Sequence, residues 1–282
     1  MMNKEFGRRC VLLVTFICTT LLAYSQGKGS LFIIGGGERS PALMQELVKT
    51  ANLRPDDYIV VLPMATSVPE ESIVYVSSQL SEHCINPITS FNFTKTQADN
   101  QQAWIDSVQN ARLIYITGGD QNKFMDVVRG TKLYDAMHRA YRNGATVSGT
   151  SAGAAVMSQI MITGAQKGKK DTDSFREIKS DYVVTSEGMG YLTNAIIDQH
   201  FIMRSRYNRL LSILADHPNK TVIGIDEGTA IIVTGKKAKV VGDSQAVVVS
   251  KPKKLRISDK GQVSFRDASL SLFSHGQSFK LK

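Results

Sequence analysis

The chain has 282 residues and a formal net charge of +9, with 42% hydrophobic and 21% charged residues. This composition is that of an ordinary soluble globular protein, and the length allows a core that needs no disulfide bonds. The basic residues carry no interleaved aromatic side chains, which excludes a nucleic-acid platform and favours a solvated basic face or weak attraction to anionic surfaces outside the cell. They are scattered, with one cluster at Lys167, Lys169 and Lys170 and another at Lys251, Lys253 and Lys254.

The first 25 residues have the pattern of a secretory signal peptide. A basic start is followed by an apolar run of 14 residues at positions 11–24, and Ala23-Tyr24-Ser25 offers small residues where a signal peptidase reads them. The run is short for a membrane span, although an uncleaved anchor is the alternative, and no cysteine follows it for lipid attachment. We expect a signal peptide at 1–25 and a single α/β domain at 26–282. That domain is expected in the periplasm or outside the cell, without stable membrane insertion after cleavage.

Removal of the leader leaves Cys84 as the single cysteine. A lone thiol forms no intramolecular disulfide, so the exported domain depends on its core for stability. The sequence around Cys84 favours a buried small side chain over a nucleophile.

Strand-like and helix-like segments alternate at short spacing in the first half of the chain. Predicted strands cover residues 30–34, 58–62, 85–93, 112–117 and 145–147, and predicted helices cover residues 42–51, 70–82, 97–110 and 124–143. This alternation predicts an α/β fold with a mostly parallel sheet covered on both faces. Gly35-Gly36-Gly37-Glu38 lacks the third glycine of a dinucleotide fingerprint, so we interpret it as a strand-to-helix turn beside a site.

The second half of the chain is more mixed. A helix-like segment at 154–160 is followed by a polar stretch at 163–180, which we interpret as a surface loop that rims the site. A buried segment at 194–197 precedes a predicted helix at 202–215 and a strand at 222–225. Three β-rich segments at 230–234, 239–241 and 246–249 are predicted to extend the sheet edge as antiparallel strands. No repeat, low-complexity segment or linker indicates a second domain.

Gly149-Thr150-Ser151-Ala152-Gly153 lies between a short β-prone run and a helix-like segment. This is the context in which a G-x-S-x-G motif becomes a nucleophile elbow, with Ser151 Oγ exposed and the amide of Ala152 as an oxyanion donor. The simpler interpretation is a Gly/Ser turn between a buried strand and a helix.

A serine nucleophile needs a base and a group that orients the base. Of the five histidines, His200 alone follows a buried segment at a predicted strand end, where catalytic side chains of α/β sheets collect. Asp226 and Glu227 follow the next buried strand and are the candidate orienting acids. The order Ser, His, acid differs from the Ser, acid, His order of α/β-hydrolases.

Four ordered motifs together resemble the cyanophycinase family of serine peptidases, which also contains dipeptidase E. The motifs are Gly118-Gly-Asp-Gln121, Gly149-Thr-Ser-Ala-Gly-Ala154, Asp198-Gln-His-Phe-x-x-Arg-x-Arg-x-x-Arg-Leu210 and Gly224-Ile-Asp-Glu-Gly-Thr-Ala230. The resemblance implies a flavodoxin-like three-layer sandwich akin to class I glutamine amidotransferases. It also implies catalysis without metal or cofactor, with Ser151 as nucleophile, His200 as base, Glu227 as orienting acid, and the amides of Gly119 and Ala152 as oxyanion donors.

The resemblance further implies an exopeptidase specific for the β-aspartyl-arginine bonds of cyanophycin, releasing β-Asp-Arg dipeptides, and the predicted signal peptide suits its export. Cyanophycin is a polyaspartate with arginine on its side-chain carboxyls. Polar groups near Ser151 that suit such a substrate are Gln121, Asp198, Gln199, Arg204, Arg206 and Arg209. Because Arg204 and Arg206 do not share a helix face, at least one arginine is expected to be structural.

Three alternatives stay open at this point. The chain can be a related aspartyl dipeptidase or isopeptidase that acts on other peptides, or a secreted binding protein on a peptidase fold. Arg204, Arg206 and Arg209 can form a solvated charged surface instead of a substrate site. The sequence does not decide between a monomer and a homodimer.

Overall fold

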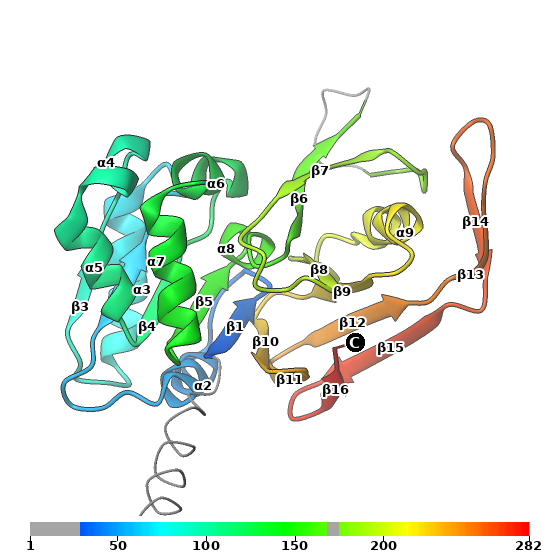
Figure 1. Cartoon of the computed structure of the whole chain (residues 1–282). Coiled ribbons are helices and arrows are strands. Elements are labelled where there is room, and N and C mark those ends of the chain that lie inside the picture. The colour runs from blue at the N-terminus through cyan, green and yellow to red at the C-terminus, as the bar shows by residue number, and fades with distance from the viewer. Residues whose placement is uncertain (1–28, 168–174, 282) are drawn as a thin grey trace, which may run out of the picture.

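The computed structural model describes residues 29–167 and 175–281, so the predicted signal peptide lies outside the described residues. An eight-stranded sheet with the order β16-β11-β10-β1-β5-β4-β2-β3 runs through the fold, and Figure 1 shows helices on both of its faces. Its strands β1, β5, β4, β2 and β3 are parallel, whereas β10, β11 and β16 are antiparallel. The predicted α/β fold, mostly parallel with antiparallel C-terminal strands, is confirmed.

Alternating apolar side chains of the parallel strands supply two cores, one on each face of the sheet. These strands are β1 (Ser30–Ile34), β2 (Ile59–Leu62), β3 (Ile88–Ser90), β4 (Leu113–Ile116) and β5 (Thr146–Thr150). In β1, Leu31 and Ile33 are buried in one core, and Phe32 and Ile34 in the other. The sheet therefore forms the middle of three layers.

Helices α2 (Pro41–Ala51) and α3 (Pro69–Ser81) cover one face of the sheet. The other face carries α4 (Lys95–Asn100), α5 (Gln102–Asn110), α6 (Gln121–Val128) and α7 (Lys132–Arg142). The helices predicted as single units at 97–110 and 124–143 are thus each two helices. Gln101 leaves the helical conformation with ψ 73°, while Gly130 has φ +71° and the Thr131 side chain caps α7.

A second sheet of four strands has the order β15-β12-β9-β8. Its strands are β8 (Ala195–Asp198), β9 (Thr221–Ile225), β12 (Gln245–Ser250) and β15 (Ser269–Ser274), of which β8 and β9 are parallel. The three β-rich segments predicted to extend one edge are in fact divided between the sheets. β10 (Thr229–Thr234) and β11 (Lys237–Gly242) continue the main sheet from β1, and β12 pairs with β9. The reason is that the chain crosses from one sheet to the other in the tight turns at 226–228 and 243–244. Local sequence patterns do not indicate such a crossing.

Three further sequence predictions are corrected in the segments that follow Ser151. The helix that follows it, α8 (Ala152–Ala155), is a single turn, and residues 160–166 are a strand instead of a helix end and loop. That strand, β6 (Ile160–Gln166), forms a hairpin with β7 (Val183–Glu187). The predicted helix at 202–215 begins only at Tyr207, as α9 (Tyr207–Asp216).

The C-terminal part adds β13 (Lys253–Ile257) and β14 (Val263–Arg266), which form a separate hairpin, and β16 (Ser278–Lys280), which pairs with β11. Figure 1 shows this antiparallel part beside the parallel strands. Within the described residues, no helix has the length and hydrophobicity needed to cross a bilayer.

The turns at the carboxyl ends of strands in both sheets meet around the segment that follows β1. Backbone hydrogen bonds join Ser151 N to Ile34 O at 3.0 Å, His200 N to Gly35 O at 2.7 Å and Gly228 N to Gly36 O at 3.0 Å. The residues that follow β5, β8 and β9 are therefore fixed relative to one another. This junction is where an open α/β sheet places its site.

Candidate active site

Ser151 occupies a sharp turn between β5 and α8. Its backbone is left-handed, with φ 52° and ψ −107°, a conformation that an L-residue adopts only under constraint. The flanking glycines permit the turn: a Cβ on Gly149 would lie 2.2 Å from Gly153 O, and a Cβ on Gly153 would lie 2.4 Å from Ile116 O. The chain therefore approaches itself too closely for side chains on either side of the serine, as expected for an elbow.

His200 lies directly after β8 and is joined to Ser151. Its Nε2 is 2.7 Å from Ser151 Oγ, and its Nδ1 is 2.5 Å from Glu227 Oε1. With Nδ1 protonated and donating to the carboxylate, Nε2 is left to accept the serine hydroxyl proton. A Cβ on Gly36 would lie 2.3 Å from His200 Cε1, so the turn after β1 lies against the ring and holds its plane.

The environment of His200 favours the neutral imidazole. Burial lowers the pKa of His200, and the positive charges of Arg204 and Arg206 lower it further, against the opposing effect of its hydrogen bond to Glu227. A base that is neutral at ordinary pH is the form that takes a proton from a hydroxyl.

Asp226, the other candidate acid after β9, does not contact the imidazole. Its Oδ1 accepts hydrogen bonds from the amides of Ile202 and Met203 at 3.0 and 2.9 Å, and its Oδ2 accepts one from Ser244 Oγ at 2.8 Å. The side chain thus ties the turn after His200 to β9 and to the start of β12. Of the two adjacent acids, Glu227 contacts the histidine and Asp226 holds the turn.

A polar cavity of about 420 Å³ opens beside Ser151 and His200. Further lining residues come from the turn after β4 and the start of α6, from β6, from the segment after β8 and from α9: Gly119, Asp120, Gln121, Asn122, Thr163, Gly164, Ala165, Gln199, Arg204, Arg206 and Arg209. The stretch predicted to rim the site thus does so through residues 163–165. Sequence reasoning missed Asp120 and Asn122, although both lie in or next to the Gly118-Gly-Asp-Gln121 motif.

The three arginines predicted to bind substrate have different surroundings. Arg209 is 3% exposed and makes a bidentate ion pair with Asp198, whose side chain is fully buried. Arg206 donates to Gln199 O at 2.7 Å and to Gln199 Oε1 at 2.5 Å. The guanidinium of Arg204 is half exposed, with Nε 4.0 Å from Glu227 Oε1. Since Arg204 and Arg206 precede α9, the premise that all three lie on one helix was wrong.

Asp198 and Gln121 have structural partners of their own. Asp198 does not line the cavity; it lies beneath Arg209. Gln121 lines the cavity and donates from Nε2 to Ile162 O at 2.9 Å, which ties α6 to β6. Because this hydrogen bond uses Nε2, the amide oxygen Oε1 of Gln121 remains available to accept a hydrogen bond from another donor.

The predicted oxyanion donors lie next to Ser151. Ala152 follows it in the chain, and Gly119 lines the same cavity. The adjacent Gly118 packs so closely that a Cβ there would lie 3.4 Å from Ser151 Cβ. Gly119 has φ +132°, and the next amide, that of Asp120, donates to Ala65 O at 2.8 Å.

Comparison with known proteins assigns the chain to a family. A family model described as peptidase family S51 matches residues 31–241, which include Ser151, His200 and Glu227. The chain belongs to this family.

Similar proteins carry a consistent set of names. The cyanophycinase of Geminocystis herdmanii is 27% identical over 270 residues, covering 90% of this chain and 94% of that protein. The cyanophycinase of Synechococcus elongatus is 25% identical over 291 residues, covering 99% and 88%. A shorter match, 26% over 136 residues, is to a peptidase E of a Nostoc species.

Solved structures of similar fold are also peptidases. A peptidase from an acI-B1 actinobacterium superposes with a TM-score of 0.66 at 22% identity, covering 90% of this chain and 98% of that one. A putative peptidase E from Listeria monocytogenes gives 0.53 at 14% identity, covering 77% and 100%. This S51 chain is thus a serine peptidase related to cyanophycinase.

Within the described part of this S51 peptidase, no three histidine, cysteine or acidic side chains form a group suited to a metal ion. Cys84 is a free thiol that is partly buried against the core between the sheet and helices α2 and α3. Burial raises the pKa of that thiol, which makes it a poor nucleophile.

Proposed function

We propose that this S51 peptidase is an exported serine exopeptidase that degrades cyanophycin and releases β-Asp-Arg dipeptides. The observation that carries the proposal is the hydrogen-bonded series Ser151–His200–Glu227, with the serine on a constrained elbow at one edge of a polar cavity. The names of the relatives that match nearly the whole chain support the choice of polymer.

Acylation begins at Ser151. His200 Nε2 takes the hydroxyl proton as Oγ attacks the carbonyl carbon, and Glu227 stabilises the imidazolium that forms. The amides of Gly119 and Ala152 are the proposed donors to the oxyanion. When the intermediate collapses, the C–N bond breaks and the imidazolium gives its proton to the leaving amine, which leaves an ester on Oγ.

Deacylation repeats these steps with water. The neutral imidazole of His200 takes a proton from water as its oxygen attacks the ester, and then returns the proton to Ser151 Oγ. The products are a free carboxylate and the regenerated serine. Because each step is a proton transfer or an acyl transfer, every atom is supplied by substrate, water and these side chains.

The product defines which bond is cleaved. An intact β-Asp-Arg unit is released only if the main-chain amide between successive aspartyl residues is hydrolysed, while the side-chain bond to arginine survives. Cleavage of the β-aspartyl-arginine bond itself, the bond that the sequence resemblance implies, would release free arginine, so the main-chain amide is proposed as the scissile bond instead. The two reactions are therefore distinguished by their products.

Recognition of an aspartyl substrate is proposed to fall chiefly on Arg204. Its guanidinium is half exposed at the cavity, whereas the guanidinium of Arg209 is held by Asp198 and that of Arg206 by Gln199. A half-exposed guanidinium is free to bind a substrate carboxylate through two hydrogen bonds. Arg206 and Arg209 add positive charge to the wall and keep Gln199 in place.

Export is proposed from the first 25 residues of the sequence, which lie outside the described part. A basic start, an apolar run and a small-residue cleavage site are the features of a secretory leader. A depolymerase that acts on polymer outside the cell suits such a leader.

Incubation of the full chain with purified cyanophycin, followed by product analysis, tests the proposal. We expect β-Asp-Arg dipeptides from the wild type and none from Ser151→Ala. Release of free arginine alone, or cleavage only of short α-aspartyl peptides, would favour the related dipeptidase or isopeptidase. Equal polymer binding by wild type and Ser151→Ala without turnover by either would favour a binding protein.

A further inference from the structure

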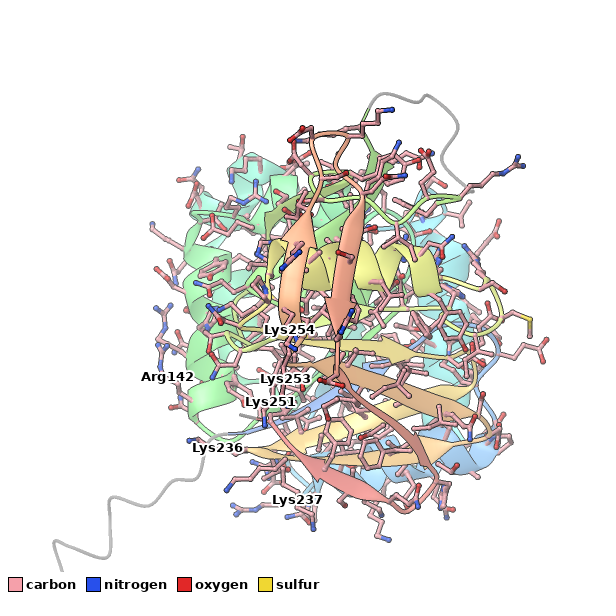
Figure 2. All side chains as sticks on the ribbon, turned by 90° about the vertical axis from the view of Figure 1, so that its right-hand side faces the viewer. Arg142, Lys236, Lys237, Lys251, Lys253 and Lys254 are labelled. Atoms are coloured by element: carbon pink, nitrogen blue, oxygen red, sulfur yellow. The ribbon has the colours of Figure 1, made fainter. Side chains whose placement is uncertain are left out.

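Six basic side chains gather on one side of the molecule, which we call the basic face (Figure 2): Arg142, Lys236, Lys237, Lys251, Lys253 and Lys254. All six are exposed. None of them contributes to the cavity at Ser151.

The basic face lies at the opposite end of the strands from the cavity. Lys236 follows β10, whose last residue, Thr234, pairs with the first residue of β1. Lys251 follows β12, which ends beside the start of β9 at the Val249–Val222 pair. Ser151, His200 and Glu227 all come after the carboxyl ends of their strands. Strands of four or five residues separate the two ends by roughly 15 Å.

Two hollows connect the members of this face. One, of about 250 Å³, is lined by Tyr141, Asn194 and Lys236 among others. The second, of about 380 Å³, lies between residues 218–221 and 250–253 and is lined by Thr221 and Lys251. Thr221 N donates to Asn194 O at 3.0 Å, so the two hollows adjoin. The residues that line these hollows therefore connect Lys236 with Lys251 and Lys253, and Arg142 follows the lining residue Tyr141 in the chain.

The charge of this face is not balanced locally. Within the described part of the chain, none of the six groups has a carboxylate within 4.0 Å, whereas Lys49 and Lys239 elsewhere both approach Glu46. Three lysines occur within the four residues 251–254, and two of them, Lys251 and Lys254, have left-handed backbones with φ 55° and 53°. Uncompensated like charges held this close repel one another and attract an anionic partner.

The chain enters the fold at the same face. Gly29, the first described residue, donates its amide to Tyr141 O at 2.7 Å, next to Arg142. In the sequence, the apolar run 11–24 ends five residues before Gly29, and five extended residues span at most roughly 17 Å. Whenever the apolar run is in a membrane, the basic face is the part of the domain nearest to the lipid surface.

We propose that the basic face docks on a bilayer that contains anionic lipids, with the cavity at Ser151 directed away from the membrane. Before the leader is cleaved, or where it is retained as an anchor, the apolar run holds this face at a membrane, which favours a bilayer over a soluble polyanion. Each lysine at such a surface strengthens binding by about fivefold, and salt screens the attraction. The docking does not depend on which reaction takes place at Ser151.

The test compares two variants of the full chain in a vesicle flotation assay. The basic-face variant carries Lys236→Gln, Lys237→Gln, Lys251→Gln and Lys253→Gln, and the control variant carries Lys49→Gln, Lys123→Gln, Lys132→Gln and Lys260→Gln. Both lose four positive charges from exposed positions, and both keep the leader. Vesicles of phosphatidylcholine alone, and with phosphatidylglycerol added, separate the electrostatic contribution from the apolar one.

We expect the basic-face variant to bind the anionic vesicles at least about 30-fold more weakly than the wild type, and the control variant to bind within about threefold. Equal losses in the two variants would overturn the proposal, because net charge alone would then explain binding. Tighter lysine-dependent binding to duplex DNA than to vesicles would overturn it too.

A melting temperature measured for each variant shows whether it is folded. If the basic-face variant unfolds, the proposal is tested with the wild type instead. Its affinity for anionic vesicles must decrease as the NaCl concentration rises from about 0.05 M to about 0.5 M. Binding that is unchanged over this range would exclude the basic face as the docking surface.

Discussion

At the scale of single residues, the protonation of His200 sets the pH at which the peptidase works. Burial and the neighbouring guanidiniums of Arg204 and Arg206 lower the pKa of this imidazole, and the base must be neutral to accept the Ser151 proton. The rate therefore rises as the pH passes upward through a pKa below the usual value for histidine, and stays high above it.

Arg204→Gln removes one of the charges that lower the pKa of His200. We expect the acid limb of kcat/KM against pH to move to higher pH, because the protonated imidazole is no longer repelled by that guanidinium. Arg142→Gln, an exposed change at the opposite end of the strands, is the control and should leave the limb in place. The pH at half-maximal kcat/KM is the measurement, and a limb unmoved by Arg204→Gln would contradict the electrostatic role.

The ion pair of Arg209 with Asp198 contributes more to the stability of the fold than to substrate binding. Arg209→Met leaves the fully buried carboxylate of Asp198 with only Arg206 Nη1, 3.8 Å away, as a cationic neighbour, and the loss of such a buried partner costs about 3 kcal/mol. Denaturant unfolding should show this loss, whereas Arg204→Met, at a half-exposed position, should change the free energy of unfolding by less than about 0.5 kcal/mol.

The pair is tested further by replacing both partners. Asp198→Leu combined with Arg209→Met removes both charges, and most of the lost stability should return, because an apolar pair of similar volume needs no compensation. A double variant no more stable than Arg209→Met alone would mean that Arg209 stabilises the fold through other contacts, such as its 3.1 Å hydrogen bond to Gln199 Oε1.

At the scale of elements, the elbow between β5 and α8 depends on the close approach of α8 to β4. Gly153→Ala places a methyl group 2.4 Å from Ile116 O, so the helix must move away from the sheet. We expect a loss of about 3 kcal/mol in the free energy of unfolding. We also expect at least a 100-fold loss in kcat, since a displacement of Ser151 by about 1 Å has that effect.

Gly235→Asn provides the matched control for that change. Gly235 differs from Gly153 in having a positive φ, 59°, and in having no atom within 4 Å of a Cβ built there, and asparagine tolerates the left-handed region. Activity and melting temperature should stay near the wild-type values. A Gly153→Ala variant as active and as stable as Gly235→Asn would contradict the role of the α8–β4 contact.

At the scale of the whole molecule, more of the site than of the surrounding fold could be predicted from the sequence. Polar residues that follow buried strands meet at one sheet edge, and this rule, together with the G-x-S-x-G motif at Ser151, selected His200 and the pair Asp226 and Glu227 from the sequence. It did not distinguish Glu227 from Asp226, because both follow β9 and only their side-chain directions differ. Nor did it show that Asp198 lies under Arg209, since the burial of a charge depends on packing between β8 and α9.

The division of the C-terminal strands between two sheets was beyond prediction for a related reason. The periodicity of β10, β11 and β12 indicates three strands, but the partner of each is set by the turns at 226–228 and 243–244. There Ser244 Oγ binds Asp226, and Asp226 N donates to Gln245 O at 3.2 Å. These contacts join residues far apart in the sequence, which local patterns do not encode.

The segment after residue 241 lies outside the family match, yet it supports the acid of the site. β12 pairs with β9 along Val222–Ile225, and β9 leads directly to Glu227. A chain ended at residue 242 would expose that edge of β9 and free the Asp226 side chain from Ser244. We therefore expect it to be inactive and to unfold without a cooperative transition.

A chain ended at residue 274 is the comparison that locates this requirement. It keeps β12 and β15 and loses the turn at 275–277, β16 and the buried Leu281, all of which pack at the far side of β11. We expect it to lose about 2–3 kcal/mol of stability while its kcat stays within about twofold of wild type. Calorimetry and dipeptide release measure the two effects. Activity retained without β12 would mean that Glu227 is held from the β1 side alone, through the hydrogen bond of Gly228 N to Gly36 O.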